Sequence, residues 1–505
     1  MLSKVISASY LGVEGYLIQV EVDISRGLPA FELVGLPNAA VREARERVRA
    51  ALRNSPYPFP TKRITINLAP ADIPKQGSYL DLPIATGILA AQQIIPNDYL
   101  TKYAVLGELS LDGQVQPVKG VLAMALTCKE AGLKGMILPQ DNYLEASAVT
   151  GLKLIPISHI NELVAFLRYG EFNPPDIPSK RNRRRSGVDL ATIKGQTFAK
   201  RGLEIAAAGN HNMLMVGPPG SGKTLLAKAL PSILPPLIDR EALEVMRIHS
   251  IVGLAKKERG LIREPPFRQP HTNITAAALI GGGRIPVPGE ISLAHHGVLF
   301  LDEMTEFHSR ILDQLRQPLE QGQIIITRNQ HRLTFPARFI FIGATNPCKC
   351  GYYGDPSGKC RCTPNMVKRY FERISGPFKD RIDLQIQTFR VDATELFSSS
   401  QGESSRIVRE RVIQAREVQR ERFKDSNIKV NSQIPPDKIK SYCPLTTDGQ
   451  KILTMALDRL ELTARGCHQI IKVARTLADL RQVKIIEDYD IKEAIQYRSL
   501  PRLYK

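Results

Sequence analysis

Met213-Leu214-Met215-Val216, Gly217-Pro218-Pro219-Gly220-Ser221-Gly222-Lys223-Thr224 and Leu225-Leu226-Ala227-Lys228-Ala229-Leu230 follow one another as an apolar run, a glycine-rich loop and a helix-like segment. Glycine permits positive φ and close backbone approach, so successive N–H groups of such a loop can surround a β-phosphate. We predict that residues 217–224 bind a nucleoside triphosphate, with Lys223 on the β/γ oxygens and the Thr224 hydroxyl on Mg²⁺. The alternative, a chance glycine-rich turn, requires the eight-residue pattern and both flanking elements to coincide.

An acidic pair follows a second apolar run about 80 residues downstream. Residues 297–301 have the composition of a buried parallel strand, and Asp302 and Glu303 come directly after it. Asp302 at a strand's carboxyl end can hold Mg²⁺ through water, and Glu303 can accept a proton from the attacking water. A helix N-terminus, where acids are common, is the alternative.

A third strand-like run, residues 338–344, delivers Thr345-Asn346. We interpret Asn346 as the polar residue that orients the hydrolytic water between the two preceding motifs. An Asn before Pro347 is also an ordinary turn former, which is the competing interpretation.

Composition limits the class of protein. A chain of 505 residues is long enough for roughly two to four domains. It carries no apolar run near the length of a bilayer span, and Met1-Leu2-Ser3-Lys4 lacks a signal-peptide pattern, so we expect a cytoplasmic protein without a membrane partner. The net charge of +19 favours polyanions, with nucleic acid as the default partner.

Four of the seven cysteines form two C-x-C pairs, Cys348/Cys350 and Cys360/Cys362, on either side of a turn-rich segment. Four thiolates that converge tetrahedrally can hold a structural zinc ion. The C-x-C spacing is tighter than is usual for zinc, so four unliganded or redox-active thiols are the alternative. Cys128, Cys443 and Cys467 are scattered and read as small core residues.

The pattern along the chain divides it into blocks. Residues 1–170 mix strand-like runs, such as 16–22 and 63–68, with helix-like segments around 38–54 and 120–132, which predicts an α+β domain. Residues 171–187 form a linker rich in proline and basic residues. Residues 188–395 alternate strands and helices, as a doubly wound parallel sheet requires, and residues 396–505 are predominantly helical, most clearly at 464–482.

Residues 323–335 predict a β-hairpin with strands at 324–327 and 333–335 and residues 328–332 at its tip. Arg328 and Arg332 at that tip are suited to contact a DNA backbone without reading its sequence. Surface charges with no ligand are the alternative.

Residues 189–480 resemble the magnesium-chelatase-like AAA+ ATPases and, within them, the ComM/YifB family. The motifs that carry the resemblance are Phe267-Arg268-x-Pro270-His271, Gly281-Gly282-Gly283-Arg284-x-Pro286-x-Pro288-Gly289-Glu290-Ile291-Ser292-Leu293-Ala294-His295, Leu315-Arg316-Gln317-Pro318-Leu319-Glu320, Asn346-Pro347-Cys348-x-Cys350-Gly351 and Ser375-Gly376-Pro377-x-x-Asp380-Arg381-Ile382-Asp383-Leu384. Lys349 and Phe378-Lys379 depart from the residues that are usual in the family.

The resemblance implies an ATPase and DNA helicase that forms a hexamer around DNA and promotes branch migration of recombination intermediates, as in natural transformation. It also implies that the 270–290 region is an insertion able to reach a central pore, which adds Arg284 to the candidate DNA-binding residues. The runner-up is a chelatase-type remodeller of a protein or cofactor complex, although the +19 charge suits a polyanion better than a small porphyrin.

The N-terminal block resembles the Lon-type protease domain through residues 72–79 and 107–120. The serine and lysine of that family's catalytic dyad align with Tyr79 and Leu122, while Ser78 and Lys119 miss the positions narrowly. A lysine activates a serine only within hydrogen-bond reach. We therefore expect a scaffold or accessory DNA-binding domain and disfavour a protease.

Two further arginines are implied to act on the nucleotide. Arg381 matches the family's arginine-finger position, which serves the neighbouring subunit, with Arg373 as the rival. Thr463-Ala464-Arg465 opens a helix of the C-terminal lid, and Arg465 is expected near the nucleotide as sensor 2, whereas Arg475 is expected to pair elsewhere.

Overall fold

The computed structural model describes residues 1–71, 73, 75, 77–172, 187–255, 261–328, 331–391, 402–460 and 463–498. The chain divides into two compact units, and each is described by itself. The first unit comprises residues 1–182 and 239–262, and the second comprises 183–238 and 263–505. The expected linker lies almost wholly outside the described residues, as does the expected boundary at 395.

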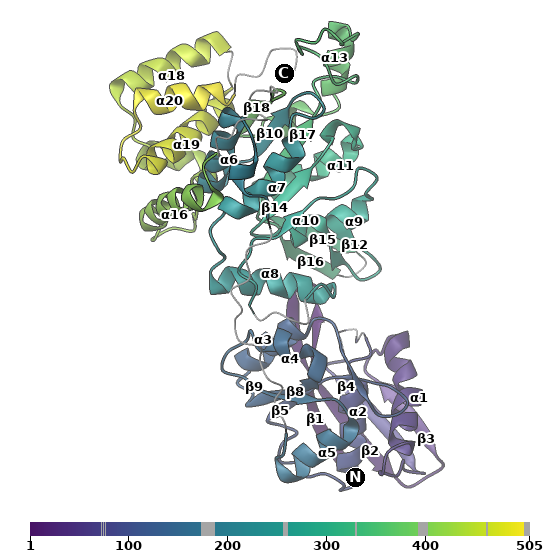
Figure 1. The fold of residues 1–505 in the computed structure, drawn as a ribbon. Coiled ribbons are helices and arrows are strands. Elements are labelled where there is room, and N and C mark those ends of the chain that lie inside the picture. Colours follow the sequence, from purple (N-terminus) through teal and green to yellow (C-terminus); the bar gives the residue numbers. More distant parts are fainter. Residues whose placement is uncertain are drawn as a thin grey trace. The chain divides into compact units, whose positions relative to one another are not determined.

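A seven-stranded sheet forms the centre of the first unit (Figure 1). Its strand order is β3(Ala30–Val34)-β4(Arg63–Ala69)-β2(Glu14–Ser25)-β1(Leu2–Leu11)-β5(Tyr103–Val105)-β8(Gly135–Pro139)-β9(Lys153–Ile157). Strand β2 runs antiparallel to both neighbours, and the other pairs are parallel. The strands predicted at 16–22 and 63–68 and the helices predicted near 38–54 and 120–132 are confirmed, the helices as α1(Ala39–Arg53) and α3(Val121–Glu130). The remaining elements are α2(Asp81–Ala91), which is buried throughout, β6(Glu108–Leu109), β7(Val115–Gln116), α4(Tyr143–Ala146) and α5(Ile160–Tyr169).

Helix α8 (Asp239–Ile251) belongs to the first unit, although we expected residues 188–395 to form one continuous core. It packs against α3, and Met246 is part of the first unit's apolar core. The Ser250 hydroxyl donates to the Glu145 carboxylate, and the Gly120 N–H donates to the Ser250 carbonyl at 3.2 Å. The amphipathic pattern of this segment shows that one face is buried but not which domain buries it.

The second unit is built on a five-stranded sheet with the order β11(Phe267–Arg268)-β14(Val298–Leu301)-β17(Ile340–Thr345)-β10(Met213–Val216)-β18(Leu384–Gln387). All of its strand pairs are parallel, which confirms the predicted parallel sheet. Every residue of β10, β14 and β17 is buried, as is typical of parallel strands. The helices before the lid are α6(Thr197–Gly209), α7(Lys223–Ile233), α9(Ala276–Ile280), α10(Glu290–Leu293), α11(Ser309–Gln314), α12(Arg316–Gln321), α13(Pro364–Phe371) and α14(Gly376–Lys379).

Two hairpins lie beside each other in the second unit (Figure 1). The first is β12(Gly281–Gly282) with β13(Val287–Pro288), and the second is β15(Gln323–Arg328) with β16(His331–Pro336). Gly281 has φ +117°, and a Cβ there would lie 3.0 Å from Ile326 Cδ1, so a side chain would separate the hairpins. The predicted hairpin is confirmed, but its strands continue to Arg328 and resume at His331, so its tip is shorter than expected.

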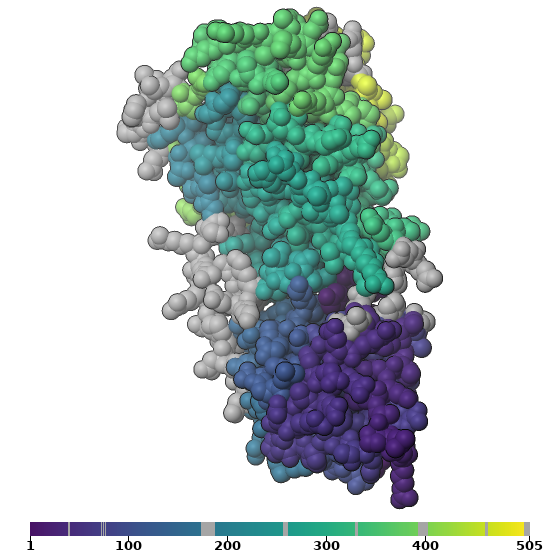
Figure 2. Space-filling model, turned by 90° about the vertical axis from the view of Figure 1, so that its right-hand side faces the viewer, coloured from purple at the N-terminus to yellow at the C-terminus, as the bar shows by residue number. Residues whose placement is uncertain are grey.

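The C-terminal helices share one apolar core with the sheet of the second unit. They are α16(Ser405–Arg422), α17(Ile439–Tyr442), α18(Thr447–Leu460), α19(Ala464–Leu480) and α20(Asp488–Gln496), and α19 confirms the helix predicted at 464–482. Helix α16 packs on α6 and α7, and α19 packs on α6. In Figure 2 the teal and green atoms of the second unit form one continuous surface. Among the described residues, the search for a helix long and apolar enough to span a bilayer finds none.

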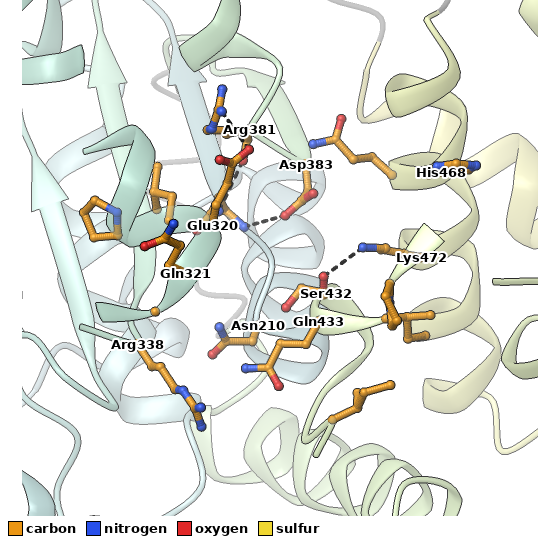
Figure 3. A pocket seen from close by; sticks show the side chains of 18 of the residues that line it. Asn210, Glu320, Gln321, Arg338, Arg381, Asp383, Ser432, Gln433, His468 and Lys472 are labelled. Carbon is orange, nitrogen blue, oxygen red and sulfur yellow. Dashed lines mark hydrogen bonds and ion pairs between the residues drawn. The ribbon is translucent and has the colours of Figure 1, made fainter. Parts of the chain in front are cut away.

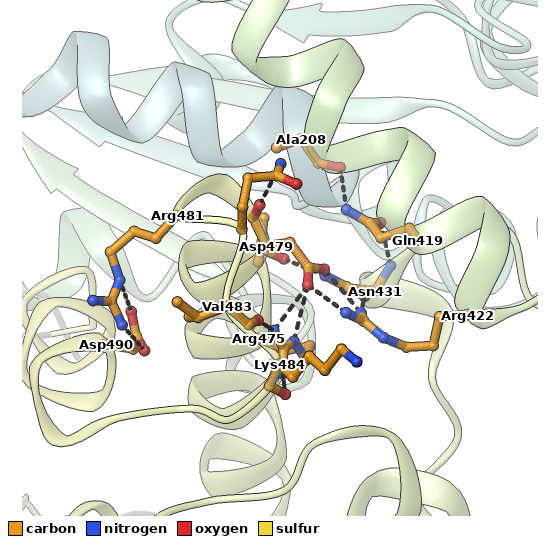
Figure 4. Close-up of polar contacts among 12 residues, drawn as sticks. Ala208, Gln419, Arg422, Asn431, Arg475, Asp479, Arg481, Val483, Lys484 and Asp490 are labelled. Atoms are coloured by element: carbon orange, nitrogen blue, oxygen red, sulfur yellow. Dashed lines mark hydrogen bonds and ion pairs between the residues drawn. The ribbon is translucent and has the colours of Figure 1, made fainter.

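A buried cluster of hydrogen-bonded polar groups connects α16 and α19 with α6 (Figure 4). The fully buried Asp479 carboxylate accepts hydrogen bonds from Arg475 Nε at 3.1 Å, Arg422 Nη1 at 2.8 Å and Asn431 Nδ2 at 2.8 Å. Asn431 in turn donates its N–H to Gln419 Oε1, and Gln419 Nε2 donates to the carbonyl of Ala208 in α6 at 3.0 Å. The expectation that Arg475 pairs away from the nucleotide is confirmed.

Asp479→Asn is expected to lower the free energy of unfolding by about 3 kcal/mol, because it leaves the buried Arg475 guanidinium without its counter-ion. Urea titration followed by circular dichroism measures the change. Glu421→Gln removes an exposed pair with Lys424 and serves as the control, for which no measurable change is expected. An equally small change in Asp479→Asn would contradict the anchoring role.

Candidate active site

The phosphate loop joins β10 to α7 with the backbone that its glycines predict. Gly220 and Gly222 have φ values of +77° and +83°, in the left-handed region that favours glycine. Gly217 is required for space and not for its φ angle, because a Cβ there would lie 2.1 Å from Thr388 Oγ1. The loop can therefore approach a ligand through its main chain.

The structure brings three of the predicted catalytic residues, Lys223, Glu303 and Asn346, to one pocket of about 460 Å³. Strand β17 pairs with β10, and β14 pairs with β17, all in parallel, so Asp302, Glu303 and Asn346 follow the strands at the same carboxyl end of the sheet as the phosphate loop. The lining residues are Pro219, Gly220, Ser221, Gly222, Lys223, Thr224, Leu225, Asp302, Glu303, Thr345 and Asn346.

Lys223 and Thr224 are already oriented by polar contacts. Lys223 Nζ donates to the carbonyls of Gly217 at 2.7 Å and Pro218 at 2.9 Å and to Asn346 Oδ1 at 3.3 Å. Burial lowers the pKa of Lys223 to about 8, against the opposing charges of Asp302 and Glu303. A phosphate beside this ammonium group would offset its desolvation, so the pocket favours a polyphosphate.

The oxygen ligands suited to Mg²⁺ also meet in this pocket. Thr224 Oγ1 donates to Asp302 Oδ2 at 2.7 Å, and Mg²⁺ prefers such hard oxygen donors together with substrate phosphates. Glu303 is exposed, with φ +48°, and stands next to the Asp302 carboxylate, which accepts its N–H at 3.0 Å. Its carboxylate is therefore free to face water at the pocket mouth.

Arg381 and Arg465 meet at a different place in the second unit, beside Glu320. Figure 3 shows Arg381 and Glu320 at this place. Arg381 Nη2 lies 2.6 Å and Arg465 Nη2 lies 2.9 Å from the same atom, Glu320 Oε1. Burial opposes the shift, but the hydrogen bonds from both arginines lower the pKa of Glu320. The Nε of Arg381 is buried and makes no hydrogen bond within the described part of the chain.

These two arginines line a pocket of about 790 Å³ that shares no lining residue with the phosphate-loop pocket. Its lining carries four cationic side chains, Arg338, Arg381, Arg465 and Lys472, and two carboxylates, Glu320 and Asp383. Arg465, which we expected near the nucleotide, lies beside Arg381 and outside the lining of the phosphate-loop pocket of its own chain, and its role as sensor 2 stays a prediction.

Arg373, the alternative candidate for the arginine finger, is half-exposed and lies beside Glu306. Its Nη1 donates to the carbonyl of Thr305 at 3.0 Å and lies 3.5 Å from Glu306, both just after Glu303. Glu320 is the residue that sequence reasoning missed. It belongs to a motif quoted for the family resemblance, yet only the folded geometry shows that it collects both arginines.

The four clustered cysteines converge as their spacing suggested. Their sulfur atoms lie within 4.8 Å of one another, with Cys348 Sγ 3.3 Å from Cys350 Sγ and 3.8 Å from Cys360 Sγ. Gly351 in the same loop has φ +88°, and a Cβ there would lie 2.8 Å from Pro219 of the phosphate loop. The cluster therefore lies directly beside the phosphate-loop pocket, which Pro219 lines.

The candidate DNA-contacting arginines, Arg284, Arg328 and Arg332, are all exposed. Arg328 pairs with His331, and Arg332 pairs with Thr327. Paired residues share a face and successive residues alternate, so Arg328 and Arg332 lie on opposite faces of the hairpin. They do not form a single patch.

The residues that align with the Lon-type catalytic dyad, and their neighbours, lie in the first unit. Tyr79 and Leu122 are buried, and the Tyr79 hydroxyl is hydrogen bonded to that of Ser9. The Ser78 hydroxyl donates to the Glu108 carboxylate, whereas Lys119 is exposed. Asp72, Pro74 and Gln76 of the same motif lie outside the described residues.

Known proteins match nearly the whole chain. The family "Magnesium chelatase, subunit ChlI" matches residues 189–396, "Magnesium chelatase, subunit ChlI C-terminal" matches 402–498, and "Subunit ChlI of Mg-chelatase" matches 20–142. A Lon protease of Desulfatibacillum aliphaticivorans is 29% identical over 164 residues, which is 30% of this chain and 19% of that protease.

Two relatives match from end to end. "Uncharacterized protein YifB" of Escherichia coli is 43% identical over 504 residues, which cover 99% of this chain and 98% of that protein. "Competence protein ComM" of Haemophilus influenzae is 42% identical over 508 residues, with the same coverage of both chains. This chain therefore belongs to the magnesium-chelatase-like ComM/YifB family.

Proposed function

We propose that the protein is an ATP- and Mg²⁺-dependent DNA motor that works as a hexameric ring and promotes branch migration of recombination intermediates. The observation that supports ATP hydrolysis most directly is the single pocket that holds Lys223, Thr224, Asp302, Glu303 and Asn346. These residues supply phosphate binding, metal ligands, a proton acceptor and a water-orienting amide.

A ring is supported by the position of Arg381 and Arg465. Phosphoryl transfer needs a further cation beyond Lys223 and Mg²⁺, and neither arginine lines the pocket of its own phosphate loop. A neighbouring subunit that placed its nucleotide against their pocket would complete both sites. Arginine suits this role because its planar fork remains protonated and can contact two phosphate oxygens.

DNA as the partner is supported by charge. The net charge is +19, and two adjacent hairpins carry the exposed Arg284, Arg328 and Arg332. The name of the Haemophilus influenzae relative, a competence protein, supports a role in DNA uptake and recombination during natural transformation.

The test is the rate of ATP hydrolysis with forked DNA, a Holliday junction or single-stranded DNA, and without DNA. Branched DNA is expected to stimulate hydrolysis most. The family match to a chelatase subunit favours a second candidate, a chelatase-type remodeller of a protein or cofactor complex. Hydrolysis that responds to no DNA would favour that candidate over the motor.

Arg328→Ala combined with Arg332→Ala is expected to weaken DNA binding about tenfold, because the hairpin then loses its phosphate contact whichever of its two faces meets the DNA. Binding of the unaltered protein should depend weakly on sequence and fall steeply with salt. Fluorescence anisotropy measures both properties. Basal ATP hydrolysis should remain within about twofold of wild type, because neither Arg328 nor Arg332 lines the phosphate-loop pocket or the pocket of Arg381 and Arg465.

A matched control removes two exposed lid arginines, Arg406 and Arg459. It loses the same charge and should bind DNA nearly normally. The single variants Arg328→Ala and Arg332→Ala identify which face of the hairpin contacts DNA. Branch migration at the wild-type rate by the double variant would remove the hairpin from the DNA interface.

We also propose that Cys348, Cys350, Cys360 and Cys362 hold a structural Zn²⁺, for which four sulfur donors are suited. Metal analysis should find about one zinc per chain, and Cys350→Ser should lose it. Because Gly351 lies against Pro219, that variant should also bind ATP more weakly. Cys467→Ser, outside the cluster, is the control. A metal-free wild-type protein with four freely titrating thiols would contradict the zinc site.

A further inference from the structure

A basic and aromatic pocket lies in the first unit, outside every site described above. Helix α1 places Arg45, Arg49 and Arg53 at i, i+4 and i+8, so the three side chains follow one stripe of the helix. Together with Lys62 they line a pocket of about 140 Å³. Its other lining residues are Pro29, Ala30, Phe31, Phe59, Pro60 and Thr61, none of which carries a charge.

The aromatic wall of this pocket is preformed. Phe31 of β3 and Phe59 of the segment before β4 are stacked, with ring centroids 6.5 Å apart and an interplanar angle of 19°, and both are only partly buried. The Arg49 guanidinium lies over the Phe59 ring, 6.0 Å from its centroid. In Figure 1, α1 and β3 lie side by side in the purple part of the first unit.

The cations are poorly neutralised. Four of them line the pocket and no carboxylate does, although Glu46 lies 3.4 Å from Arg45 at the surface. The Nε of Arg49 is buried and has no hydrogen-bond partner among the described residues. A buried donor without an acceptor is costly, and an anion in the pocket would offset the positive charge of this guanidinium and of the three other cations.

We propose that this pocket binds single-stranded nucleic acid, with phosphates on the α1 arginines and Lys62 and a base against Phe31 and Phe59. Guanidinium groups bind phosphate well, and aromatic side chains stack on bases of any sequence. A duplex keeps its bases stacked inside, whereas a single strand exposes them, which selects the single strand. The site goes beyond the motor function, because it lies in the unit that carries no nucleotide pocket residue.

Photo-cross-linking of the full chain to an oligonucleotide of 5-iodouracil, followed by peptide mass spectrometry, tests the site locally. Adducts are expected on peptides that contain Phe31 or Phe59, and unlabelled oligothymidylate should compete for them. The triple variant Arg45→Gln, Arg49→Gln and Arg53→Gln should reduce their yield about tenfold. The control variant Arg42→Gln, Lys129→Gln and Lys134→Gln removes the same charge from exposed positions of the same unit and should retain them.

Phe59→Leu should also lower the yield of cross-linked adducts. Because this variant keeps all four cations, it separates the contribution of stacking from that of charge. An unchanged melting temperature in each variant shows that the fold is intact. Equal adduct yields in the two triple variants, or adducts only elsewhere in the chain, would overturn the proposal. Complete competition by inorganic phosphate would overturn it as well, since the pocket would then take a free anion. None of these readouts requires ATP hydrolysis, so failure here is distinct from failure of the motor.

Discussion

Lys223→Ala is expected to reduce ATP turnover below about 1% of wild type while the protein stays folded. The main-chain conformation of the loop depends on Gly220 and Gly222, which the variant keeps. The variant removes the ammonium group, which donates hydrogen bonds to the Gly217 and Pro218 carbonyls and to the Asn346 side chain. Without it, the charge that develops on the γ-phosphoryl group loses its nearest protein cation.

Glu303→Gln provides the matched contrast. It should also stop hydrolysis, because the amide cannot accept a proton, but it should still bind ATP, because Thr224 and Asp302 retain their contact. Single-turnover hydrolysis and binding of a fluorescent ATP analogue separate the two variants. Near-normal hydrolysis by Glu303→Gln would exclude Glu303 as the proton acceptor, and turnover above about 10% in Lys223→Ala would exclude the assigned role of Lys223.

The nucleotide pocket could be predicted from the sequence because its parts follow from local pattern. Asp302 and Asn346 each follow an apolar run, and parallel strands deliver their carboxyl ends to one edge. The start of the lid helix was equally local, since Thr463 caps it by accepting the N–H of Gly466. In these segments the chemistry and the element that carries it are encoded within a few residues.

The local sequence predicts a helix, but it does not predict which part of the fold that helix packs against. The sequence of α8 shows that it has an apolar face but not which unit buries that face, and in the structure Met246 joins the core of the first unit. Arg465 was assigned to the correct helix, but the packing of α19 on α6 decides which pocket it enters. The hairpin shows the same limit, because its register, and not its composition, puts Arg328 and Arg332 on opposite faces.

Mixing an Arg381→Ala chain with a Lys223→Ala chain is expected to restore ATP hydrolysis that neither variant shows alone. Loss of an arginine finger costs about 10³-fold or more in turnover. In a mixed ring, an intact phosphate loop on the Arg381→Ala chain can face an intact Arg381 on the Lys223→Ala chain. Equal mixing of independent interfaces gives about one quarter of the wild-type rate.

The same mixing experiment with an Arg465 variant tests whether Arg465 acts on the nucleotide of its own chain or of the neighbouring chain. Arg381 and Arg465 share Glu320 Oε1 and line one pocket away from their own phosphate loop, so both should serve the neighbour. Arg465→Ala mixed with Lys223→Ala should then recover activity as well. If Arg465 instead acts on its own chain's nucleotide, no interface in that mixture is complete and no activity returns. Full activity of Arg381→Ala alone, or no recovery in mixed rings verified by mass spectrometry, would contradict catalysis shared through Arg381. Recovery with both arginine variants would show that Arg381 and Arg465, which share Glu320 in the free chain, both act on the nucleotide of the neighbouring subunit.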